Sequence, residues 1–541
     1  MLNLANNALF IRNWRERMRF STVVSYLLIL TLLIVIIIVN AQINYRYSEG
    51  GNIQGHSYPS YSQETHQPWY QKALIDLCAL QAVVILLFGV FSGYKMAEND
   101  KINGTLDFHR SSPTPSYIQT IGIVFGSTVL EWVCFSAIFL VLICFSFIYK
   151  ISILAILQFE VSLVFCAVFY HIFAVLIGIT SNSHDNRRST ARAFILIYFV
   201  SMLFSSSNLS FLYHMTWIPP FEQLKLNIGE NIANLNYRYG ISSLQLYELK
   251  YMMFGFKVNS LILQIIVLIP MIALGFEGIN RKITSSEHAI VTKGQSLMTL
   301  LFMLFMFLGS ALSAVLLGID TLNSQQYHSG FAGLNILPIL IIALGILGSI
   351  IVTPTKLSFS KGLSKANKSG VIGINWEDEH SSNCYWLLMF CFISSVMFIF
   401  YGIIYKATLK ETIISLIISL SYPVFFASIY EWFRFGKFYN KPIILFCIIF
   451  ILWVIMPYLG SIIAPLFINM GYKNYFLAFS PFSGAVFAIS AIQDKNFSII
   501  ETLPVLQVVI ITTFAAWLLA YVRRMEITKD ILGKKNISNI K

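Results

Sequence analysis

Ionisable side chains inside long apolar stretches are the residues of this sequence most able to do chemistry: Asp76, Glu131, Glu160, His171 and, at the edge of one stretch, Glu431. Glu160 and His171 are eleven residues apart, so they share one face of a helix. Charged groups inside a membrane are costly and are functional candidates by default. A series of them can relay protons, and a single one can contact a substrate or hydrogen-bond to a neighbouring helix. We expect Glu131 in the middle of its span and Glu431 at a membrane interface.

A short polar segment between the second and third apolar stretches carries the most informative motif. It begins near Glu98 and contains Gly104-Thr105-Leu106-Asp107-Phe108, then His109-Arg110 and Ser112-Pro113. The segment resembles the cytoplasmic loop between spans 2 and 3 of permeases in the ABC-2 type exporter family. In that family an acidic residue precedes Gly-Thr-Leu-Glu-Phe-Leu and Ser-Pro. His109 and Arg110 stand where the family usually has apolar residues.

The resemblance implies a permease that exports its substrate by alternating access. A coupling helix in the polar segment would dock on a cytoplasmic ABC ATPase subunit, of which two copies bind. The residues carried over to this coupling loop are Glu98, Gly104, Thr105, Leu106, Asp107, Phe108 and Arg110. Outer elements of the family help to close a gate, which makes Pro220, Phe221, Pro481 and Phe482 gating candidates. Glu131, Glu160 and His171 are pathway or gating candidates because they are ionisable and lie within spans.

The composition assigns these residues to a membrane protein. Of 541 residues, 57% are hydrophobic and 11% are charged, whereas about 25% of residues are charged in a soluble protein. Continuous apolar runs such as 26–39 and 443–457 suit spanning helices. We therefore predict an all-α fold, a polytopic helical membrane protein. Water-soluble and disordered classes are excluded.

Hydropathy predicts twelve transmembrane helices: 22–40, 73–94, 120–148, 151–180, 193–213, 260–279, 296–318, 335–353, 385–405, 410–430, 442–467 and 502–521. With both termini cytoplasmic, most of the 37 lysine and arginine residues fall in inner segments, as the positive-inside rule requires. The net charge of +12 therefore indicates orientation, and no nucleic acid partner is expected. We expect a multi-pass protein of a bacterial cytoplasmic (inner) membrane.

The spans form two groups of six with a common layout, which predicts two halves of parallel topology. Each half has a basic inner loop after its second span and a Pro-Phe pair before its sixth. The predicted halves are 22–280 and 296–522, joined by a cytoplasmic linker at 281–295 and followed by a basic tail at 523–541. The second-half loop, 355–384, lacks the Gly-Thr-Leu motif, so its ATPase contact either differs from the first or has degenerated.

Residues 1–21 predict an amphipathic helix on the inner membrane surface. Apolar residues such as Trp14 alternate there with basic ones. We expect the basic side chains to face anionic lipid, which makes membrane lipid a partner. The residues concerned are Arg12, Arg15, Arg17 and Arg19.

The sequence contains no signature of bond chemistry. Gly362 to Ser369 resembles a phosphate-binding loop, but Asn367 stands where its second glycine belongs. The seven cysteines lie inside or at the edges of apolar spans, so neither disulfides nor a metal framework are expected. We predict no enzymatic activity and no cofactor, with ATP hydrolysis on a partner subunit.

A second class of function stays open, namely a proton-coupled secondary transporter that uses Glu131, Glu160 and His171. Parallel six-plus-six repeats also suit that class. The 45 Phe and 27 Tyr favour an apolar or amphipathic substrate without identifying it. A homodimer is compatible with the sequence.

Overall fold

The computed structural model describes residues 8–50, 68–111, 113–180, 210–228, 252–285, 289–316, 337–354, 356–368, 380–404, 407–436, 451, 455, 480–481, 486–490 and 499–538. Contacts divide the chain into two units. Unit 1 contains Met1–Met252 and Phe256–Ser286, and unit 2 contains Met253–Gly255 and Glu287–Lys541. The division after residue 286 lies inside the linker predicted at 281–295.

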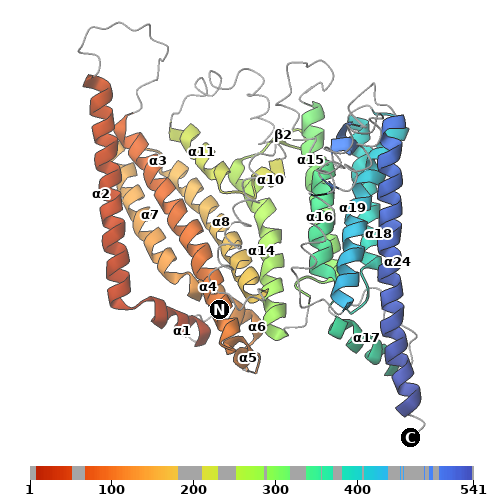
Figure 1. Ribbon diagram of the computed structural model, residues 1–541. Helices are drawn as coiled ribbons and strands as arrows, with labels where there is room; N and C mark the ends of the chain where they lie inside the picture. Colours follow the sequence, from red (N-terminus) through yellow and green to blue (C-terminus); the bar gives the residue numbers. More distant parts are fainter. Residues whose placement is uncertain are drawn as a thin grey trace. The chain divides into compact units, whose positions relative to one another are not determined.

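Unit 1 is built from long helices that run side by side (Figure 1). Its elements are α1 (Ala8–Arg17), α2 (Phe20–Gly50), α3 (Trp69–Ala82), η3 (Val83–Phe88), α4 (Gly89–Ile102), α5 (Thr105–Arg110), α6 (Ser116–Ser127), α7 (Val129–Tyr149), α8 (Ile153–Thr180), α10 (Ser210–Tyr213), α11 (Ile218–Ile228), strand β2 (Phe256–Lys257) and α14 (Ser260–Thr284). The short strand β1 (Met252–Met253) falls at the boundary between the units, with Met252 in unit 1. α3, the π-helical turn η3 and α4 are continuous, and we call them the central helix (69–102).

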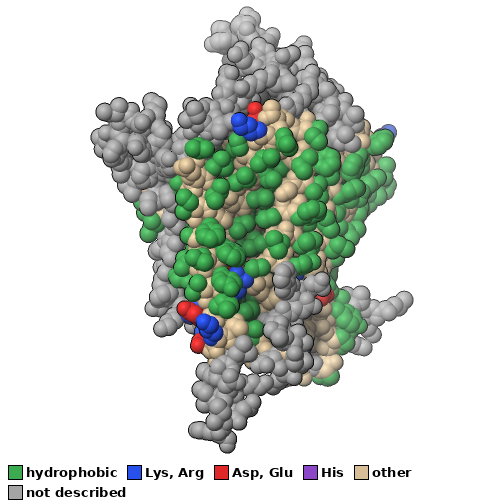
Figure 2. All heavy atoms as spheres, turned by 90° about the vertical axis from the view of Figure 1, so that its right-hand side faces the viewer, with side chains coloured by type: hydrophobic (Ala, Val, Ile, Leu, Met, Phe, Trp, Pro, Cys, Tyr) green, Lys and Arg blue, Asp and Glu red, His purple; other side chains and the backbone are tan. Residues whose placement is uncertain are grey.

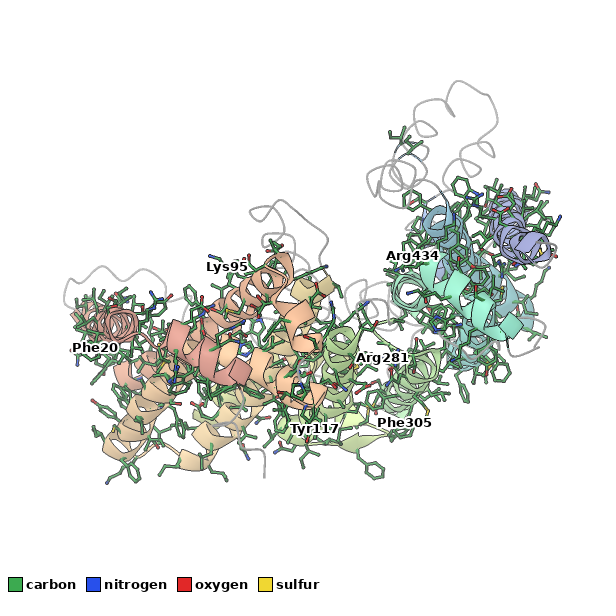
Figure 3. All side chains as sticks on the ribbon, turned by 90° about the horizontal axis from the view of Figure 1, so that it is seen from below. Phe20, Lys95, Tyr117, Arg281, Phe305 and Arg434 are labelled. Atoms are coloured by element: carbon green, nitrogen blue, oxygen red, sulfur yellow. The ribbon has the colours of Figure 1, made fainter. Side chains whose placement is uncertain are left out.

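The apolar core of unit 1 lies where the central helix packs against α7 and α8. Leu77, Ile85, Ile138 and Leu163 are completely buried there. In contrast, α2 lies at the edge of the unit, with Phe20 84% exposed and far from α14 in the view from below (Figure 3). A helix that is apolar all round and exposed on most sides faces lipid.

Unit 2 contains α15 (Lys293–Leu316), α16 (Leu337–Val352), α17 (Lys356–Lys368), α18 (Cys384–Ile404), α19 (Leu409–Phe435) and α24 (Ile499–Ser538). α19 begins with a capping box, in which Thr408 and Glu411 each bond the other's backbone N–H. The face in Figure 2 is hydrophobic over most of its height, with Lys, Arg, Asp and Glu near its upper and lower margins. Such a band is the surface that a membrane protein presents to lipid.

Nine helices within the described residues are long and apolar enough to cross a membrane. This confirms the all-α polytopic class. The prediction of one span over 120–148 was wrong, because the chain breaks at Thr128 (φ −115°, ψ 15°) into α6 and α7. The helix at 335–353, α16, has only 16 residues. Spans 193–213 and 442–467 lie largely outside the described residues, so the number twelve and the topology stay predictions.

Candidate functional site

The predicted coupling loop is a tight turn followed by the short helix α5. The central helix ends at Ile102, where the Asn103 N–H still bonds the Asn99 carbonyl (2.9 Å). Gly104 then takes a φ of +70°, a left-handed conformation that glycine adopts without strain. This explains the glycine of the Gly-Thr-Leu motif and turns the chain into α5.

The side chains of α5 divide into buried and exposed ones. Leu106 is buried (2% exposed), whereas Phe108 is 71% exposed and Asp107 is also exposed. Ile102, just before the turn, is 46% exposed, and Thr105 is half-buried. We call Ile102, Asp107 and Phe108 the α5 surface. Exposed aromatic side chains are enriched in protein-binding surfaces.

Arg110 ties α5 to the C-terminal end of α14. Its Nε donates to the Ile283 carbonyl (3.2 Å) and its Nη2 to the Lys282 carbonyl (3.0 Å). It also forms an ion pair with Asp107. The last carbonyls of a helix have no partners within the helix, and an arginine satisfies them well. Displacement of α5 therefore pulls on α14.

Glu98 does not belong to the α5 surface, contrary to the prediction. It is 2% exposed, and the Tyr94 hydroxyl donates to its Oε1 (3.0 Å) within α4. Leu106 of the predicted loop likewise points inward. Burial of Leu106 anchors the loop to the bundle, whereas the described Glu98 contact lies within α4.

The basic residues of α1 also differ from the prediction that they face lipid. Arg12 Nη2 donates to both carboxylate oxygens of Asp100 in α4 (2.8 and 2.7 Å). Arg17 lies 3.9 Å from a carboxylate oxygen of Glu131. α1 packs closely on α6, where a Cβ at Gly126 would be 3.0 Å from Asn13. α1 is thus fastened to the end of the bundle that carries α5.

Replacing Arg12 with Gln will destabilise unit 1 by about 1–3 kcal/mol, because it leaves Asp100 buried without its cation while the half-exposed arginine is partly screened by solvent. Thermal unfolding in detergent measures the effect. Arg15→Gln is the matched control, since Arg15 is exposed on the same helix, and should change little. Adding Asp100→Asn to Arg12→Gln should restore most of the loss. Equal unfolding of the Arg12 and Arg15 variants would contradict the assignment.

Glu131 lies in the first turn of α7, not in the middle of a span. The break at Thr128 places it there, close to the end of the bundle that carries α1 and α5. The Ser92 hydroxyl, on the central helix, donates to its Oε1. Together with Arg17, this contact makes Glu131 a junction between α1, α7 and the central helix.

Glu160 and His171 lie on one face of α8, as predicted, and both point at the central helix. Gln81 Nε2 donates to Glu160 Oε2 (3.1 Å), and His171 Nε2 donates to the Ile85 carbonyl (2.8 Å). Ile85 lies in the π-helical turn η3, a distortion often found at functional positions. The His171 ring fits because residue 89 is glycine.

The three candidates do not bond to one another in the part of the chain that the structure describes. Each bonds a different level of the central helix, at Gln81, Ile85 or Ser92. Within the same residues, Glu131 Oε2 and Glu160 Oε1 have no hydrogen-bond partner. Each of these side chains therefore joins its own helix to the central helix. Hydrogen bonding to a neighbouring helix was one of the roles that the sequence left open for them. Asp76, also on the central helix, is half-buried.

Of the two Pro-Phe pairs, the first is fully described. Pro220 and Phe221 are buried in α11, and the Phe221 ring meets Phe159 edge-on at 5.3 Å and Trp217 at 5.7 Å. This joins α11 to α8. Pro481 is buried in a helical position, and Phe482 lies outside the described residues.

In unit 2, Glu431 is buried (2% exposed) near the C-terminal end of α19, and its position at a membrane interface stays a prediction. Its Oε1 lies 3.5 Å from Arg524 Nε of α24. Close by, α17 packs Phe359 and Leu363 against Phe435 and Ile527. The second-half loop thus contains a helix, which sequence reasoning missed. Its signal was the pair Phe359 and Leu363, four residues apart.

Comparison with protein-family models, with curated proteins and with solved structures finds no match to this chain. Among the described residues, no group of three His, Cys, Asp or Glu side chains is placed to hold a metal ion. Function is therefore inferred from the residues of the chain itself.

Proposed function

We propose that the chain is the permease subunit of an ATP-driven exporter, with α5 as a docking element for a separate ATPase. The observation that carries this is the α5 surface. Phe108 and Asp107 project outward while Leu106 and Arg110 hold the same short helix to the bundle. A partner that binds Phe108 can move the central helix and α14, to which α5 is joined.

Force applied at α5 has two routes into unit 1. One is the turn at Gly104, which leads directly into the central helix. The other is Arg110, which holds the last carbonyls of α14. Because the central helix bonds α8 through Gln81 and Ile85, a tilt of the central helix carries α8 with it. Such a rigid-body tilt is the step that alternating access requires.

The proposal includes two copies of a cytoplasmic ABC ATPase subunit, one for each half. The second would contact α17, which lies in the predicted loop 355–384 and exposes Leu357 (56%) and Lys361. The orientation follows the positive-inside rule and the setting is a bacterial cytoplasmic membrane. The cargo is apolar or amphipathic.

Proton-coupled transport is the second candidate, favoured only by the burial of Glu131, Glu160 and His171. Within the described residues their hydrogen bonds lead to the central helix and not from one to the next, so a continuous proton path is not built from them. We rank this function second for that reason.

Glu160→Gln separates the two functions. The amide keeps a carbonyl that can accept from Gln81 and removes the ionisable group. We therefore expect unchanged or slightly higher thermal stability, and ATP hydrolysis by the purified permease–ATPase complex within about twofold of the unaltered protein. The contrary result is a substrate flux in sealed vesicles that a pH gradient drives without ATP and that Glu160→Gln abolishes. It would show that Glu160 carries the coupled proton and would contradict the exporter proposal.

A further inference from the structure

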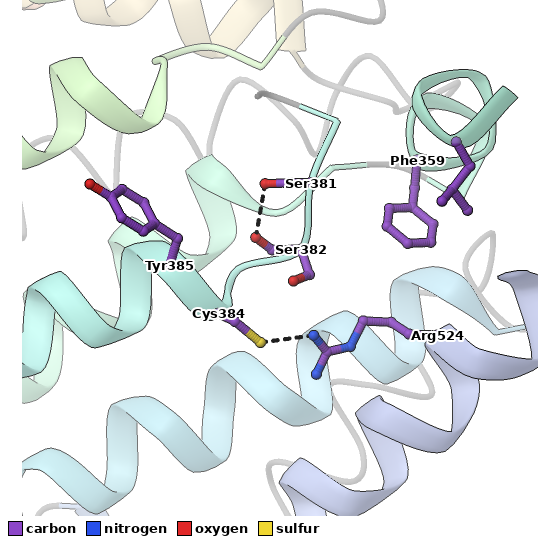
Figure 4. A pocket seen from close by; sticks show the side chains of 7 residues that line it. Phe359, Ser381, Ser382, Cys384, Tyr385 and Arg524 are labelled. Atoms are coloured by element: carbon purple, nitrogen blue, oxygen red, sulfur yellow. Dashed lines mark hydrogen bonds between the residues drawn. The ribbon is translucent and has the colours of Figure 1, made fainter. Parts of the chain in front are cut away.

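A cavity of about 250 Å³ lies in unit 2 between α17, the start of α18 and α24 (Figure 4). Phe359 and Leu363 of α17 form its apolar side. The polar side contains the hydroxyls of Ser381 and Ser382 and the guanidinium of Arg524. A cavity with one apolar and one cationic side suits an amphiphile with an anionic group.

Arg524 is built into this cavity. Its Nη1 donates to the Cys384 sulfur (2.8 Å), and its Nε donates to the Ala520 carbonyl (3.4 Å). A guanidinium has five N–H donors, and those on Nη2 have no hydrogen-bond partner among the described residues. The side chain is only 14% exposed and lines the cavity. Such a planar fork binds phosphate oxygens in pairs.

The charges around the cavity favour an anion. Lys293 is 2% exposed and donates to both the carbonyl and the hydroxyl of Ser381. Glu431 is the carboxylate next to Arg524. Lys293 and Arg524 thus bring two cations to the polar side of the cavity, and basic surroundings of this kind favour an anionic ligand.

An apolar surface continues from the cavity along α18. Tyr385 lines the cavity, and Leu388 and Phe392, at helical spacing beyond it, are 61% and 67% exposed. On α24, the rings of Trp517 and Tyr521 stack with their centroids 5.7 Å apart, just before Arg523 and Arg524 in the chain. Trp and Tyr at this level mark the membrane interface. The cavity is thus at headgroup depth, with an exposed apolar track leading into the membrane.

We propose that this cavity binds an anionic phospholipid, with the phosphate on Arg524 and Ser382 and an acyl chain along Leu388 and Phe392. The lipid would join α17 to α18 and α24, and so fix the position of α17. Basic recesses between membrane helices are known binding places for such headgroups.

The test uses the full chain in nanodiscs of phosphatidylcholine containing a small fraction of a photoreactive phosphatidylglycerol. Cross-linked peptides are identified by mass spectrometry. We expect labelling around 382–392 and 520–525. Arg524→Gln should lower it about tenfold, as for loss of a charge-assisted hydrogen bond to phosphate. The matched control is Arg523→Gln, which removes the same charge one residue away and should leave labelling unchanged.

Arg524 also supports Glu431, so a second variant keeps it. Ser382→Asp places a carboxylate in the cavity and should lower labelling to a similar extent, with an unchanged unfolding temperature in pure phosphatidylcholine. Equal labelling of all variants would overturn the site. Displacement of the lipid by millimolar inorganic phosphate would assign the cavity to a soluble anion and overturn the lipid. A rise in labelling after neutralising the acidic residues 377–379 would show that the chain itself supplies the anion, and would also overturn it.

Discussion

Replacing Gly89 with Ala is expected to cost about 2–4 kcal/mol of stability, from overpacking together with loss of a buried hydrogen bond. A Cβ at this position would lie 2.0 Å from His171 Nε2 and 2.8 Å from the neighbouring ring carbon. The ring is 1% exposed and bonded to the Ile85 carbonyl. It therefore has to leave its place, and the contact between α8 and the central helix opens. Thermal unfolding of the purified protein measures the loss.

Gly294→Ala is the matched control for this prediction. It lies in α15, also a helical glycine, and a Cβ there would meet nothing within 4 Å. Gly294 lies in the first turn of α15, where the preference for alanine is smaller than the roughly 0.5–1 kcal/mol of a helix interior, so this variant should be neutral or slightly stabilised. Equal destabilisation of both variants would show that His171 is not held against the central helix as described.

Replacing Phe108 with Ala is expected to weaken binding of the ATPase at least about tenfold, because truncating an aromatic anchor at an interface commonly costs 2 kcal/mol or more. Stability should be unchanged, since the side chain is 71% exposed in the isolated permease. The affinity of the purified permease for its ATPase, measured by surface-based binding, gives the first quantity. Thermal unfolding gives the second.

The chain supplies a control for Phe108 in Phe256. That side chain is 74% exposed in β2, just before the start of α14, whereas α5 is attached to the end of α14. Phe256→Ala removes as much exposed aromatic surface and should leave ATPase binding intact. If both variants bind the ATPase normally, α5 is not the docking element.

Local periodicity predicted the parts of the site that one helix determines. Glu160 and His171 share a face because eleven residues are close to three turns, and that holds in any straight helix. Their partners could not be predicted, because Gln81 and Ile85 are 79 and 86 residues away in the chain. Which helix packs against that face is decided by tertiary contacts that no local pattern encodes.

The largest errors of the sequence-based predictions concerned the direction in which side chains point and the residues at which helices end. Glu98 looked like a surface residue of a polar loop, yet α4 continues past it and turns it toward Tyr94. The break at Thr128 had a signal in Gly126-Ser127-Thr128, since small and hydroxylated residues weaken a helix. Close to this break α1 packs on α6 at Gly126, a contact between distant parts of the chain that no local pattern predicts. The arginines of α1 were expected to face lipid because the sequence does not show that Asp100, the partner of Arg12, lies beside α1. Asp100 is in another helix, 88 residues away in the chain.

The mass of the complex purified from its native membrane in mild detergent tests the central claim most directly. The account predicts one chain with two copies of a nucleotide-binding subunit in native mass spectrometry. The chain released from membranes at its own mass of 61.4 kDa, or as a simple multiple of it with no nucleotide-binding subunit, would contradict it.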